Sequence, residues 1–398
     1  MNIILFDDPA TKINLLPFTF TRPISDIRIG ILTIKEKWEK WLPADYSYLS
    51  EEYLSKKFGL HREKENLYLN GCVLPNSELI KAVKSLNKNQ LLIKDHLPIA
   101  FYGNVDSVDE LSYEFQSRTD GMVFYTSEML SVQNVYDIFI YNGVAIRSDF
   151  KLLTSERKSC HIEDSHTAVY NSTDIFLEEN VHIKSAVLNA EKGPIYIGAN
   201  SEIGEGSIIK GATSIGENVI LNLGARIRGD VTIGPHCKIG GEISNSVIFG
   251  YSNKAHDGFM GNSVLGEWCN VGADTNTSNL KNDYKNVRVW NYGEERFVDT
   301  GSQFCGLIMG DHSKCGINTM FNTGTVVGVS SNIFGSGFPR VFIPSYSYGG
   351  SHGFSTYNFE TACAVVRKVF ERRKKALGEV DVNILKHIFE ITKKYRSA

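Results

Sequence analysis

The chain has 398 residues, of which 42% are hydrophobic and 22% charged, and its net charge is −3. This balance excludes a protein that binds nucleic acid through bulk positive charge, and no apolar run approaches the ~18 residues of a membrane-spanning helix. We therefore expect neither nucleic acid nor a membrane as a partner. The segment Met1–Asp8 has no basic region and too short an apolar run for a secretory signal, and the seven cysteines form no C-x-x-C pair. These features predict a cytoplasmic protein with reduced thiols and no metal site.

Residues 1–155 have the pattern of an α/β domain. Short apolar runs typical of strands alternate with segments of helical spacing. The expected strands are Ile3–Phe6, Leu67–Leu69, Leu91–Ile93 and Met122–Tyr125, and the expected helices are Ile31–Trp41 and Ser77–Leu86. Such alternation predicts a mostly parallel sheet that binds ligands at the carboxyl ends of its strands. The charged stretch Thr154–Asp164 is the expected junction with the next domain.

The middle of the chain repeats an aliphatic residue every six positions. The eight members of this series are Ile197, Ile203, Ile209, Ile215, Leu221, Ile227, Ile233 and Ile239. A helix repeats its apolar face every 3.6 residues and a strand every 2, so neither explains the period. A period of six is typical of the hexapeptide repeat, in which three hexads form one triangular coil and the aliphatic residues point inward. We predict a left-handed parallel β-helix over residues 165–345.

The six-residue period is interrupted twice, at about residues 245–264 and 277–300. It resumes after these interruptions at Leu265, Val271, Met309, Cys315, Phe321 and Val327. Because a solenoid expels insertions as loops, often on its binding face, we expect both interruptions to be loops that carry chemistry. Cys237 and Cys315 lie within hexads and are expected to be buried.

His256 falls in the first interruption, within Ser252–Gly258. Imidazole is the side chain whose ordinary pKa best suits a general base near neutral pH. A loop histidine by itself is more often structural or merely exposed. The stretch Leu265–Asn279, however, adds amides and hydroxyls shortly after this one. We therefore take His256 as the candidate catalytic base.

The C-terminal part predicts a loop and then a helical segment. The stretch Phe334–Gly353 is rich in Gly, Ser and Pro and has no repeat. Within residues 355–398 we expect helices at Asn358–Leu377 and Val382–Tyr395, with Gly378 between them. Basic residues crowd the first helix at Arg367, Lys368, Arg372, Arg373, Lys374 and Lys375. This run is either a solvated helix face or an edge that faces a phosphate or the adenine nucleotide of coenzyme A.

Residues 195–330 resemble the bifunctional UDP-N-acetylglucosamine pyrophosphorylase/glucosamine-1-phosphate N-acetyltransferases. In that family a loop S-K-A-G-H precedes I-G-x-x-x-N-I-G-A-G-T-x-T-x-N. The chain has Asn253–His256 without the glycine, then Leu265-Gly266, Asn270–Ala273 and Asn279. Ala225–Arg228 resembles the family segment A-R-L-R-P-G. The family's tyrosine three residues after the histidine is a phenylalanine here, and its sugar-binding lysine has no clear counterpart.

The resemblance implies a homotrimeric N-acetyltransferase that uses acetyl-CoA and glucosamine-1-phosphate. His256 would take a proton from the amine as it attacks the thioester. Arg228, Asn270 and Asn279 would contact the sugar phosphate. Ala273 would contact the cofactor. No cysteine is needed, so we expect direct transfer in a ternary complex.

The first domain resembles sugar nucleotidyltransferases. Ile4–Asp8 matches their first strand, and Leu15–Pro23 stands where they have a glycine-rich loop, which this chain lacks. Asn70 matches the position of a magnesium-binding aspartate, although an amide is a poorer Mg²⁺ ligand than a carboxylate. If this domain uses UTP and Mg²⁺, Arg22 is the expected phosphate contact, with Asp7 or Asp8 as further candidates. The alternative for Arg22 is a salt bridge that holds the loop.

Three interpretations remain open at this point. The first is an acetyltransferase in sugar-nucleotide synthesis, with or without uridylyl transfer by the first domain. The second is a trimeric β-helix scaffold with a degenerate first domain. The third is a nucleotidyltransferase for another substrate, such as glucose-1-phosphate with a thymidine triphosphate.

Overall fold

A computed structural model describes residues 2–107 and 121–396. The chain forms two compact units. Unit one comprises Met1–Leu15, Thr21–Ile27 and Leu32–Asn134, and unit two comprises Leu16–Phe20, Arg28–Ile31 and Val135–Ala398. In the described ranges, no helix is long and apolar enough to cross a membrane.

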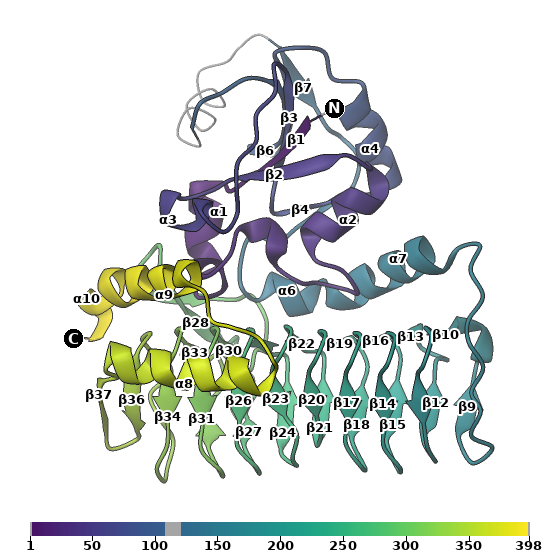
Figure 1. The fold of residues 1–398 in the computed structure, drawn as a ribbon, viewed down its shortest axis with the longest axis vertical. Coiled ribbons are helices and arrows are strands. Elements are labelled where there is room, and N and C mark those ends of the chain that lie inside the picture. The colour runs from purple at the N-terminus through teal and green to yellow at the C-terminus, as the bar shows by residue number, and fades with distance from the viewer. Residues whose placement is uncertain (1, 108–120, 397–398) are drawn as a thin grey trace. The chain divides into compact units, whose positions relative to one another are not determined.

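Unit one is built on a six-stranded mixed sheet (Figure 1). Its strands, in spatial order, are β2 Asp45–Leu49, β1 Asn2–Phe6, β3 Asn66–Asn70, β6 Leu97–Gly103, β5 Gln90–Lys94 and β7 Met122–Phe124. The pairs β1–β2, β1–β3 and β5–β7 are parallel, whereas β3–β6 and β5–β6 are antiparallel. The four expected strands are confirmed. The sequence analysis missed β2 and β6, and β6 follows β5 after a tight turn at Asp95 and His96, both with positive φ.

The helices of unit one begin where side chains cap them. They are α1 Pro9–Asn14, α2 Ile34–Trp41, α3 Glu52–Ser55 and α4 Ser77–Lys84. Thr33 and Glu36 form a capping box, so α2 starts three residues later than expected. Asn76 accepts a hydrogen bond from the backbone of Leu79 and fixes the start of α4.

The predicted left-handed parallel β-helix forms the body of unit two (Figure 1). Each coil contributes one strand to each of three faces, which we call the first, second and third face in chain order. The first face contains β10 Ile175–Leu177, β13 Ile195–Ile197, β16 Thr213–Ile215, β19 Val231–Ile233, β22 Val247–Ile248, β25 Val264–Leu265, β30 Ile308–Met309, β33 Val326–Val327 and β35 Phe342–Ile343. The second face contains β11 His182–Ile183, β14 Glu202–Ile203, β17 Ile220–Leu221, β20 Lys238–Ile239, β23 Asn253–Lys254, β26 Asn270–Val271, β31 Lys314–Cys315, β34 Asn332–Ile333, β36 Ser347–Gly350 and β37 Gly353–Thr356. The third face contains β9 Ala168–Tyr170, β12 Val187–Asn189, β15 Ile208–Lys210, β18 Arg226–Arg228, β21 Glu242–Ser244 and β24 Phe259–Gly261, and β27 Asn276–Thr277 and β32 Met320–Phe321 continue the coils.

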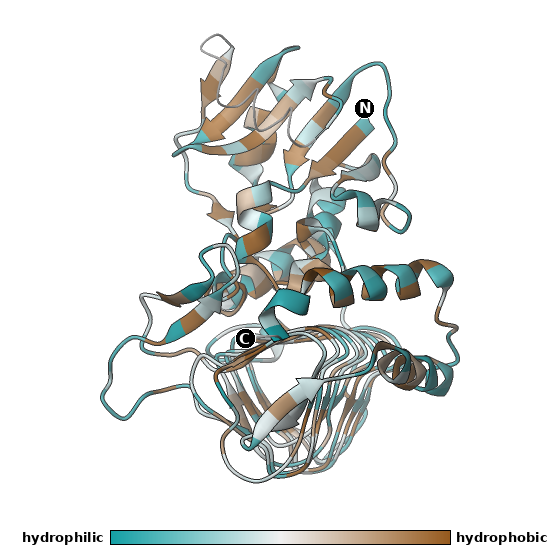
Figure 2. Cartoon of the chain, turned by 90° about the vertical axis from the view of Figure 1, so that its left-hand side faces the viewer, coloured by the Kyte–Doolittle hydropathy of each residue, from teal (hydrophilic) through white to brown (hydrophobic). Residues whose placement is uncertain are grey.

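The interior of the prism is a stack of buried aliphatic side chains. Figure 2 looks along the stack, whose coils have a triangular outline. All eight residues of the six-residue series are at most 2% exposed. Cys237 and Cys315 are buried as expected, and burial raises the pKa of the Cys237 thiol to about 12.

The expectation of a loop at residues 245–264 is wrong. The strands β22, β23, β24 and β25 continue the coils through this range. The six-residue spacing breaks only because some edges of the triangle are shorter: the inward residues Ile239, Ile243 and Ile248 are four and five positions apart. The six-residue period therefore breaks without any insertion. An edge with fewer residues brings the next inward side chain closer in sequence, which interrupts the period just as an insertion would.

The second interruption is an excursion, as expected. The chain leaves the coil after β27 and returns at β30, and between them β28 Arg288–Asn291 and β29 Arg296–Asp299 form an antiparallel hairpin. Trp290 of this hairpin stacks on Phe342 of the first face, with ring centroids 4.2 Å apart. The hairpin is therefore packed onto the prism within unit two.

The expected loop Phe334–Gly353 is wrong in part. It contains β35, β36 and the start of β37, which add to the first and second faces. The helices α8 Phe359–Arg372, α9 Glu379–Ile391 and α10 Lys393–Arg396 follow. The two expected helices are thus confirmed, and Gly378 lies at the N-cap of α9.

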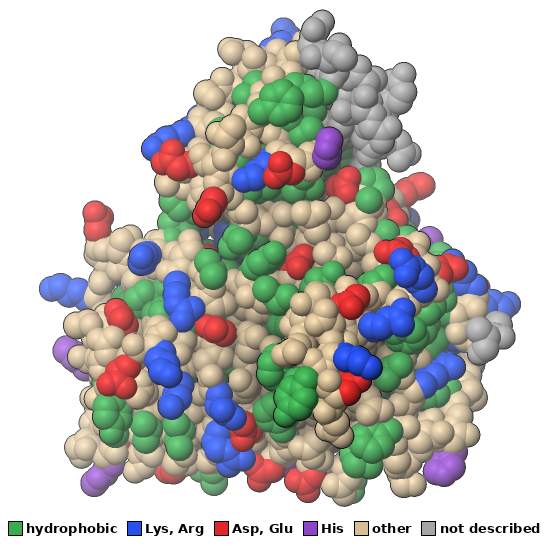
Figure 3. Space-filling view, turned by 180° about the vertical axis from the view of Figure 1, so that it is seen from behind, with side chains coloured by type: hydrophobic (Ala, Val, Ile, Leu, Met, Phe, Trp, Pro, Cys, Tyr) green, Lys and Arg blue, Asp and Glu red, His purple; other side chains and the backbone are tan. Residues whose placement is uncertain are grey.

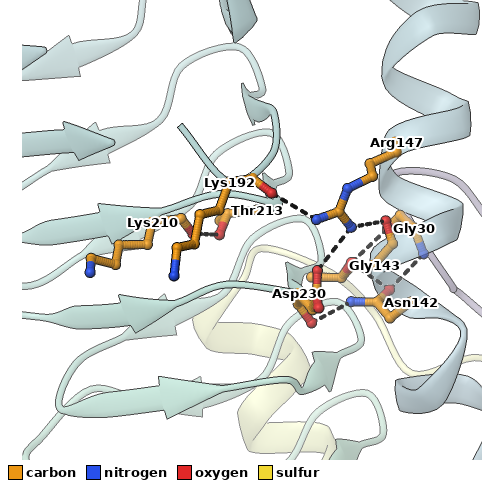
Figure 4. A network of polar contacts seen from close by, with 9 residues as sticks. Gly30, Asn142, Gly143, Arg147, Lys192, Lys210, Thr213 and Asp230 are labelled. Atoms are coloured by element: carbon orange, nitrogen blue, oxygen red, sulfur yellow. Dashed lines mark hydrogen bonds and ion pairs between the residues drawn. The ribbon is translucent and has the colours of Figure 1, made fainter. Parts of the chain in front are cut away.

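A polar network ties helix α7 Asn142–Thr154 to the corner between the third and first faces (Figure 4). The Arg147 guanidinium donates to the carbonyl of Lys192 at 2.9 Å and pairs with Asp230 at 3.1 Å. The Asn142 side chain accepts from the backbone N–H of Gly30 and donates to the carbonyl of Asp230, both at 2.8 Å. These contacts lie within unit two, of which α6 Asp137–Ile140 and α7 are part.

Candidate functional site

His256 lies on a corner of the prism rather than in a long loop. The strand β23 ends at Lys254, the chain turns through Ala255–Gly258, and β24 begins at Phe259. We call this turn the His256 corner. The His256 side chain is exposed there. Gly258 has a φ of +113°, and a Cβ at this position would come within 2.1 Å of the Thr275 carbonyl oxygen, so the corner requires glycine.

The corner is held from inside the prism by a buried lysine. Lys254 is 1% exposed and occupies an inward position of the second face. Its ammonium donates to the carbonyl of His256 at 2.6 Å and to the carbonyl of Asp257 at 3.2 Å. Burial lowers the pKa of Lys254 to about 8, although the nearby Asp257 opposes this shift. The sequence analysis treated Lys254 only as part of a motif and missed its position.

Asn270 and Ala273 lie in the coil next to His256. Asn270 faces outward on the second face, where its Oδ1 accepts from Asn253 Nδ2 at 2.7 Å. The corner that contains Ala273 stacks directly on the His256 corner, because the backbone N–H of Asp274 donates to the Asp257 carbonyl at 3.0 Å. The structure therefore brings these two predicted residues close to the His256 corner.

Asn279 lies at the opposite edge of the third face. It follows β27, and its Nδ2 donates to Asn262 Oδ1 at 2.8 Å, just beyond the end of β24. His256 precedes β24, so the width of the third face separates the two side chains within one chain. The structure does not bring Asn279 and His256 together in one protomer.

A cavity of about 500 Å³ opens beside the residues that follow Asn279. Its lining combines two cations, several amides and hydroxyls, and apolar surface: Ser278, Leu280, Lys281, Asn282, Arg288, Phe297, Asn322, Thr323 and Val341. The sequence analysis missed Lys281 and Arg288, because the excursion that presents them has no repeat. Their positive charges and the surrounding amides suit a hydroxylated anion.

Arg228 is exposed on the third face. Its Nη1 lies 2.7 Å from Glu242 Oε1, and Arg226 lies 3.7 Å from the same carboxylate. On the face of the β-helix seen in Figure 3, Lys and Arg side chains gather in a column at the left, among fewer Asp and Glu side chains. Because the Glu242 carboxylate already pairs with the Arg228 guanidinium, a phosphate would have to compete with Glu242 for it.

An aromatic column runs along the corner between the first and second faces. His236 stacks on Tyr251 with centroids 4.7 Å apart, and Tyr251 stacks on Trp268 at 4.1 Å. Phe370 of α8 covers Trp268 at 4.2 Å, and the ammonium of Lys375 lies 4.9 Å above the Tyr251 ring. At least part of the basic run thus packs on the prism, and the cationic Lys375 adds to burial in lowering the pKa of His236.

In unit one, the carboxylates at the end of β1 hold the chain in place. Asp7 is 3% exposed, and its carboxylate contacts Lys12 Nζ at 3.0 Å and accepts from the Ile24 N–H at 2.8 Å. Asp8 caps helix α1, accepting from the N–H of Thr11 at 2.8 Å. Both candidate aspartates are therefore engaged in local structure.

Asn70 and Arg22 are buried. Asn70 is 0% exposed, and its amide donates to the Pro98 carbonyl at 2.9 Å and accepts from the Cys72 N–H at 3.1 Å. These bonds leave Asn70 poorly placed to bind Mg²⁺. Arg22 is 7% exposed. It lies two residues before Ile24, whose backbone N–H donates to the Asp7 carboxylate. Within the described ranges, no group of three or more His, Cys, Asp or Glu residues could hold a metal ion.

A second cavity, of about 470 Å³, lies wholly within unit one. It is lined by α1, by the β5–β6 turn and by the segment after β7: Asp8, Ala10, Thr11, Asn14, Lys94, Asp95, His96, Leu97, Pro98, Met129, Ser131 and Gln133. The lining includes Asp8, two residues after β1 ends, and Lys94, the last residue of β5. The cavity therefore lies at the edge of the sheet where ligands were expected.

Comparison with known proteins identifies relatives of both units. Residues 3–158 match the family described as "Sugar nucleotidyl transferase". Over 264 residues the chain is 26% identical to a bifunctional sugar-1-phosphate nucleotidylyltransferase/acetyltransferase of Sulfurisphaera tokodaii, which covers 66% of this chain and 59% of that protein. Over 90 residues it is 40% identical to the bifunctional protein GlmU of Methanococcus aeolicus, which covers 23% of this chain and 21% of that protein.

A third relative is covered more fully. Over 178 residues the chain is 34% identical to the uncharacterized acetyltransferase YaiX of Escherichia coli, which covers 43% of this chain and 75% of that protein. The chain spans less than two thirds of the length of the two bifunctional relatives.

Proposed function

We propose that the β-helix transfers an acetyl group from acetyl-CoA to an amino sugar phosphate, glucosamine-1-phosphate. The chain belongs to the same family as the acetyltransferase YaiX, and its similarity to a bifunctional sugar-1-phosphate nucleotidylyltransferase/acetyltransferase supports the proposal. The observation that carries the proposal is the exposed His256 on a corner of the prism, next to Asn270 and the corner that contains Ala273. In this proposal residues 165–345 are the acyltransferase domain.

The chemistry needs a base and a group that stabilises negative charge. His256 takes the proton from the sugar amine as the nitrogen attacks the thioester carbonyl, which contributes typically about 10²–10⁴-fold. Backbone N–H groups of the coil stabilise the tetrahedral oxyanion, each worth about 3 kcal/mol. The thiolate of coenzyme A then leaves.

The cysteines support direct transfer without an acyl-enzyme. Six of the seven are buried, and Cys160 is exposed. Burial raises the pKa of the Cys237, Cys269 and Cys305 thiols, which keeps them protonated and poorly nucleophilic.

We further propose a homotrimer in which neighbouring protomers complete the site. His256 lies at one edge of the third face, whereas Asn279 and the cavity with Lys281 and Arg288 lie at the other. Packing around a three-fold axis would bring the His256 edge of one prism against the cavity edge of the next. Lys281, Arg288 and Arg228 are the candidate phosphate contacts in this arrangement, and Asn270 and Asn279 the candidate sugar contacts.

Thiol release from acetyl-CoA tests the proposal. With glucosamine-1-phosphate as the acceptor we expect a stoichiometric release of coenzyme A, and with glucose-1-phosphate, which lacks the amine, none. Equal release with both sugars would show hydrolysis rather than transfer and would contradict the proposal. A trimer is tested by light scattering, where a stable monomer at micromolar concentration would count against it.

Uridylyl transfer by unit one is the second candidate function. The sugar nucleotidyl transferase match and the cavity beside Asp8, Thr11 and Lys94 favour it. The engaged amide of Asn70 and carboxylate of Asp7 weigh against Mg²⁺ binding. We therefore expect weak or absent Mg²⁺-dependent turnover of UTP with N-acetylglucosamine-1-phosphate. Robust pyrophosphate release that Arg22→Ala abolishes would overturn this expectation.

A further inference from the structure

We propose that Lys254 is a positioning residue that holds His256 in place from inside the prism. This inference rests on the proposed acetyl transfer, because it gives the His256 corner a catalytic purpose. Lys254 never reaches the surface where a substrate would bind. Its influence on the reaction would pass entirely through the backbone of His256 and Asp257.

The position of Lys254 is one that the fold normally fills with an aliphatic residue. In register along the second face, Ile203, Leu221 and Ile239 precede it, and Val271 and Cys315 follow it. Lys254 is among the largest fully buried side chains of the described chain. An ammonium loses its hydration on burial, and only good hydrogen bonds offset that loss. A lysine is therefore expected at this position only if its ammonium forms interactions that an isoleucine cannot form.

The hydrogen bonds of the ammonium are interactions of this kind. Both recorded acceptors are carbonyls of the turn that carries the histidine, those of His256 and Asp257. The Asp257 carbonyl also accepts from the N–H of Asp274 in the next coil, so the lysine joins an existing link between coils. A flexible corner would let the imidazole move, and a shift of about 1 Å at a catalytic group costs up to about 10²-fold in rate.

The coil on the other side leaves room for the ammonium. Gly241 has a φ of +73°, and a Cβ built there would lie 2.9 Å from Lys254 Nζ and 2.8 Å from the His256 carbonyl oxygen. Gly240 is also crowded, since its Cβ would come within 2.3 Å of the Ala255 carbonyl oxygen. The two consecutive glycines of this coil thus accommodate both the corner and the side chain that holds it.

The test replaces the ammonium without emptying the prism. Lys254→Met and Lys254→Ile keep an inward aliphatic side chain. As the control, Ile203→Met places a methionine at the equivalent inward position of the second face, three coils before Lys254. We expect both Lys254 variants to fold with a Tm at or above that of the wild type. Their kcat for acetyl transfer should fall by about 10-fold or more, with the KM for acetyl-CoA within about 2-fold. Ile203→Met should keep the wild-type kcat.

Amide hydrogen exchange separates this inference from the proposed function. In Lys254→Met, peptides that cover residues 252–260 should exchange at least about 10-fold faster, while peptides that cover residues 197–221 should not change. Unchanged exchange at the corner would overturn the positioning role, even if the wild type transfers no acetyl group. Faster exchange with an unchanged kcat would also overturn it. If neither variant folds, Lys254 determines the fold rather than the placement of His256, and the inference fails.

Discussion

The coils before Ile239 and the coils after it differ in what they place inside the prism. From Ile197 to Ile239 every sixth residue is aliphatic and every edge of the triangle has the same length. After Ile239 three edges shorten, one to four positions and two to five, and Lys254 and Thr277 take inward positions. The first region is uniform and carries no candidate for catalysis, whereas the second carries His256.

This contrast indicates how a repetitive fold accommodates a site. An insertion would have placed His256 on a mobile loop, but the chain instead alters the length and interior of its coils while each strand stays paired with its neighbours. In the regular coils the inward series is entirely aliphatic, and buried hydrogen bonds such as those of Ser201 and Ser207 come from residues outside that series. The altered coils add buried polar bonds, which are directional and can fix a corner in one conformation.

The largest expected effect is on the rate of acetyl transfer, which should depend on His256 and not on another exposed histidine. His256→Ala should lower acetyl transfer by about 10²–10⁴-fold, because the base is lost while the exposed corner keeps its backbone. His182, exposed on the second face of an early coil, provides the matched control, and His182→Ala should leave the rate unchanged. Steady-state rates of thiol release measure both. Activity of His256→Ala within twofold of the wild type would remove this residue from the mechanism.

A cavity in the uniform coils should destabilise the fold. Ile227 is 1% exposed inside the third face, and Ile227→Ala should lower the free energy of unfolding by about 2–5 kcal/mol. On the same face, the neighbouring strand exposes Ile208 (40%), and Ile208→Ala should change the free energy by no more than about 0.5 kcal/mol. Urea unfolding at a fixed protein concentration measures both. Equal effects of the two variants would mean that the interior of these coils is not tightly packed.

In the altered coils, the buried Lys254 should instead make the free energy of unfolding depend on pH. The pKa of Lys254 is lowered by burial to about 8, from 10.5 in the unfolded chain. Below pH 8 the ammonium is charged in both states, so its full burial cost is present. As the pH rises from 8 towards 10.5, the folded chain has lost the proton and the unfolded chain still holds it, so the wild type gains stability.

The size of this gain is at most about 3 kcal/mol, since one pKa unit corresponds to about 1.4 kcal/mol. We expect Lys254→Met to exceed the wild type by about 1–3 kcal/mol at pH 7, with a difference that shrinks by pH 10. Urea unfolding of both proteins at pH 7, 8.5 and 10 checks this. Lys314, whose pKa burial also lowers to about 8, is present in both proteins and cancels. A difference independent of pH would show that the pKa of Lys254 is the same in the folded and the unfolded chain, and that burial does not lower it.

Sequence alone predicted the elements that depend on local periodicity. The β-helix, four strands of unit one and both C-terminal helices follow from apolar spacing. The start of α2 was expected three residues too early, because apolar spacing does not report the cap that Thr33 and Glu36 form. The strand β6 was missed because a pairing across a tight turn is not a periodic feature. The expected loop around His256 was wrong because a shortened edge and an insertion both break a count of six.

The candidate site was less predictable, because it depends on which strands become neighbours. The proximity of Asn270 to the His256 corner follows from the coil register, and sequence resemblance anticipated it. The distance of Asn279 from His256, by contrast, follows from the width of a face, which no motif encodes. The inward orientation of Lys254 could have been deduced: it lies six residues after Ile248 and six before Met260, at a position where the repeat demands a buried side chain.

The smallest expected effect concerns the exposed charges of the third face. The pair of Arg228 and Glu242 spans 2.7 Å but lies at the surface, where ion pairs contribute about 0–1 kcal/mol. Arg228→Ala should therefore leave the free energy of unfolding within about 1 kcal/mol of the wild type. If Arg228 contacts the sugar phosphate, the KM for glucosamine-1-phosphate should rise by about 5–10-fold, with the KM for acetyl-CoA unchanged. Arg226→Ala removes a cation that lies 3.7 Å from the same carboxylate and serves as the control. Equal rises in KM for the two variants would indicate a general effect of surface charge, and Arg228 would then not be a specific phosphate contact.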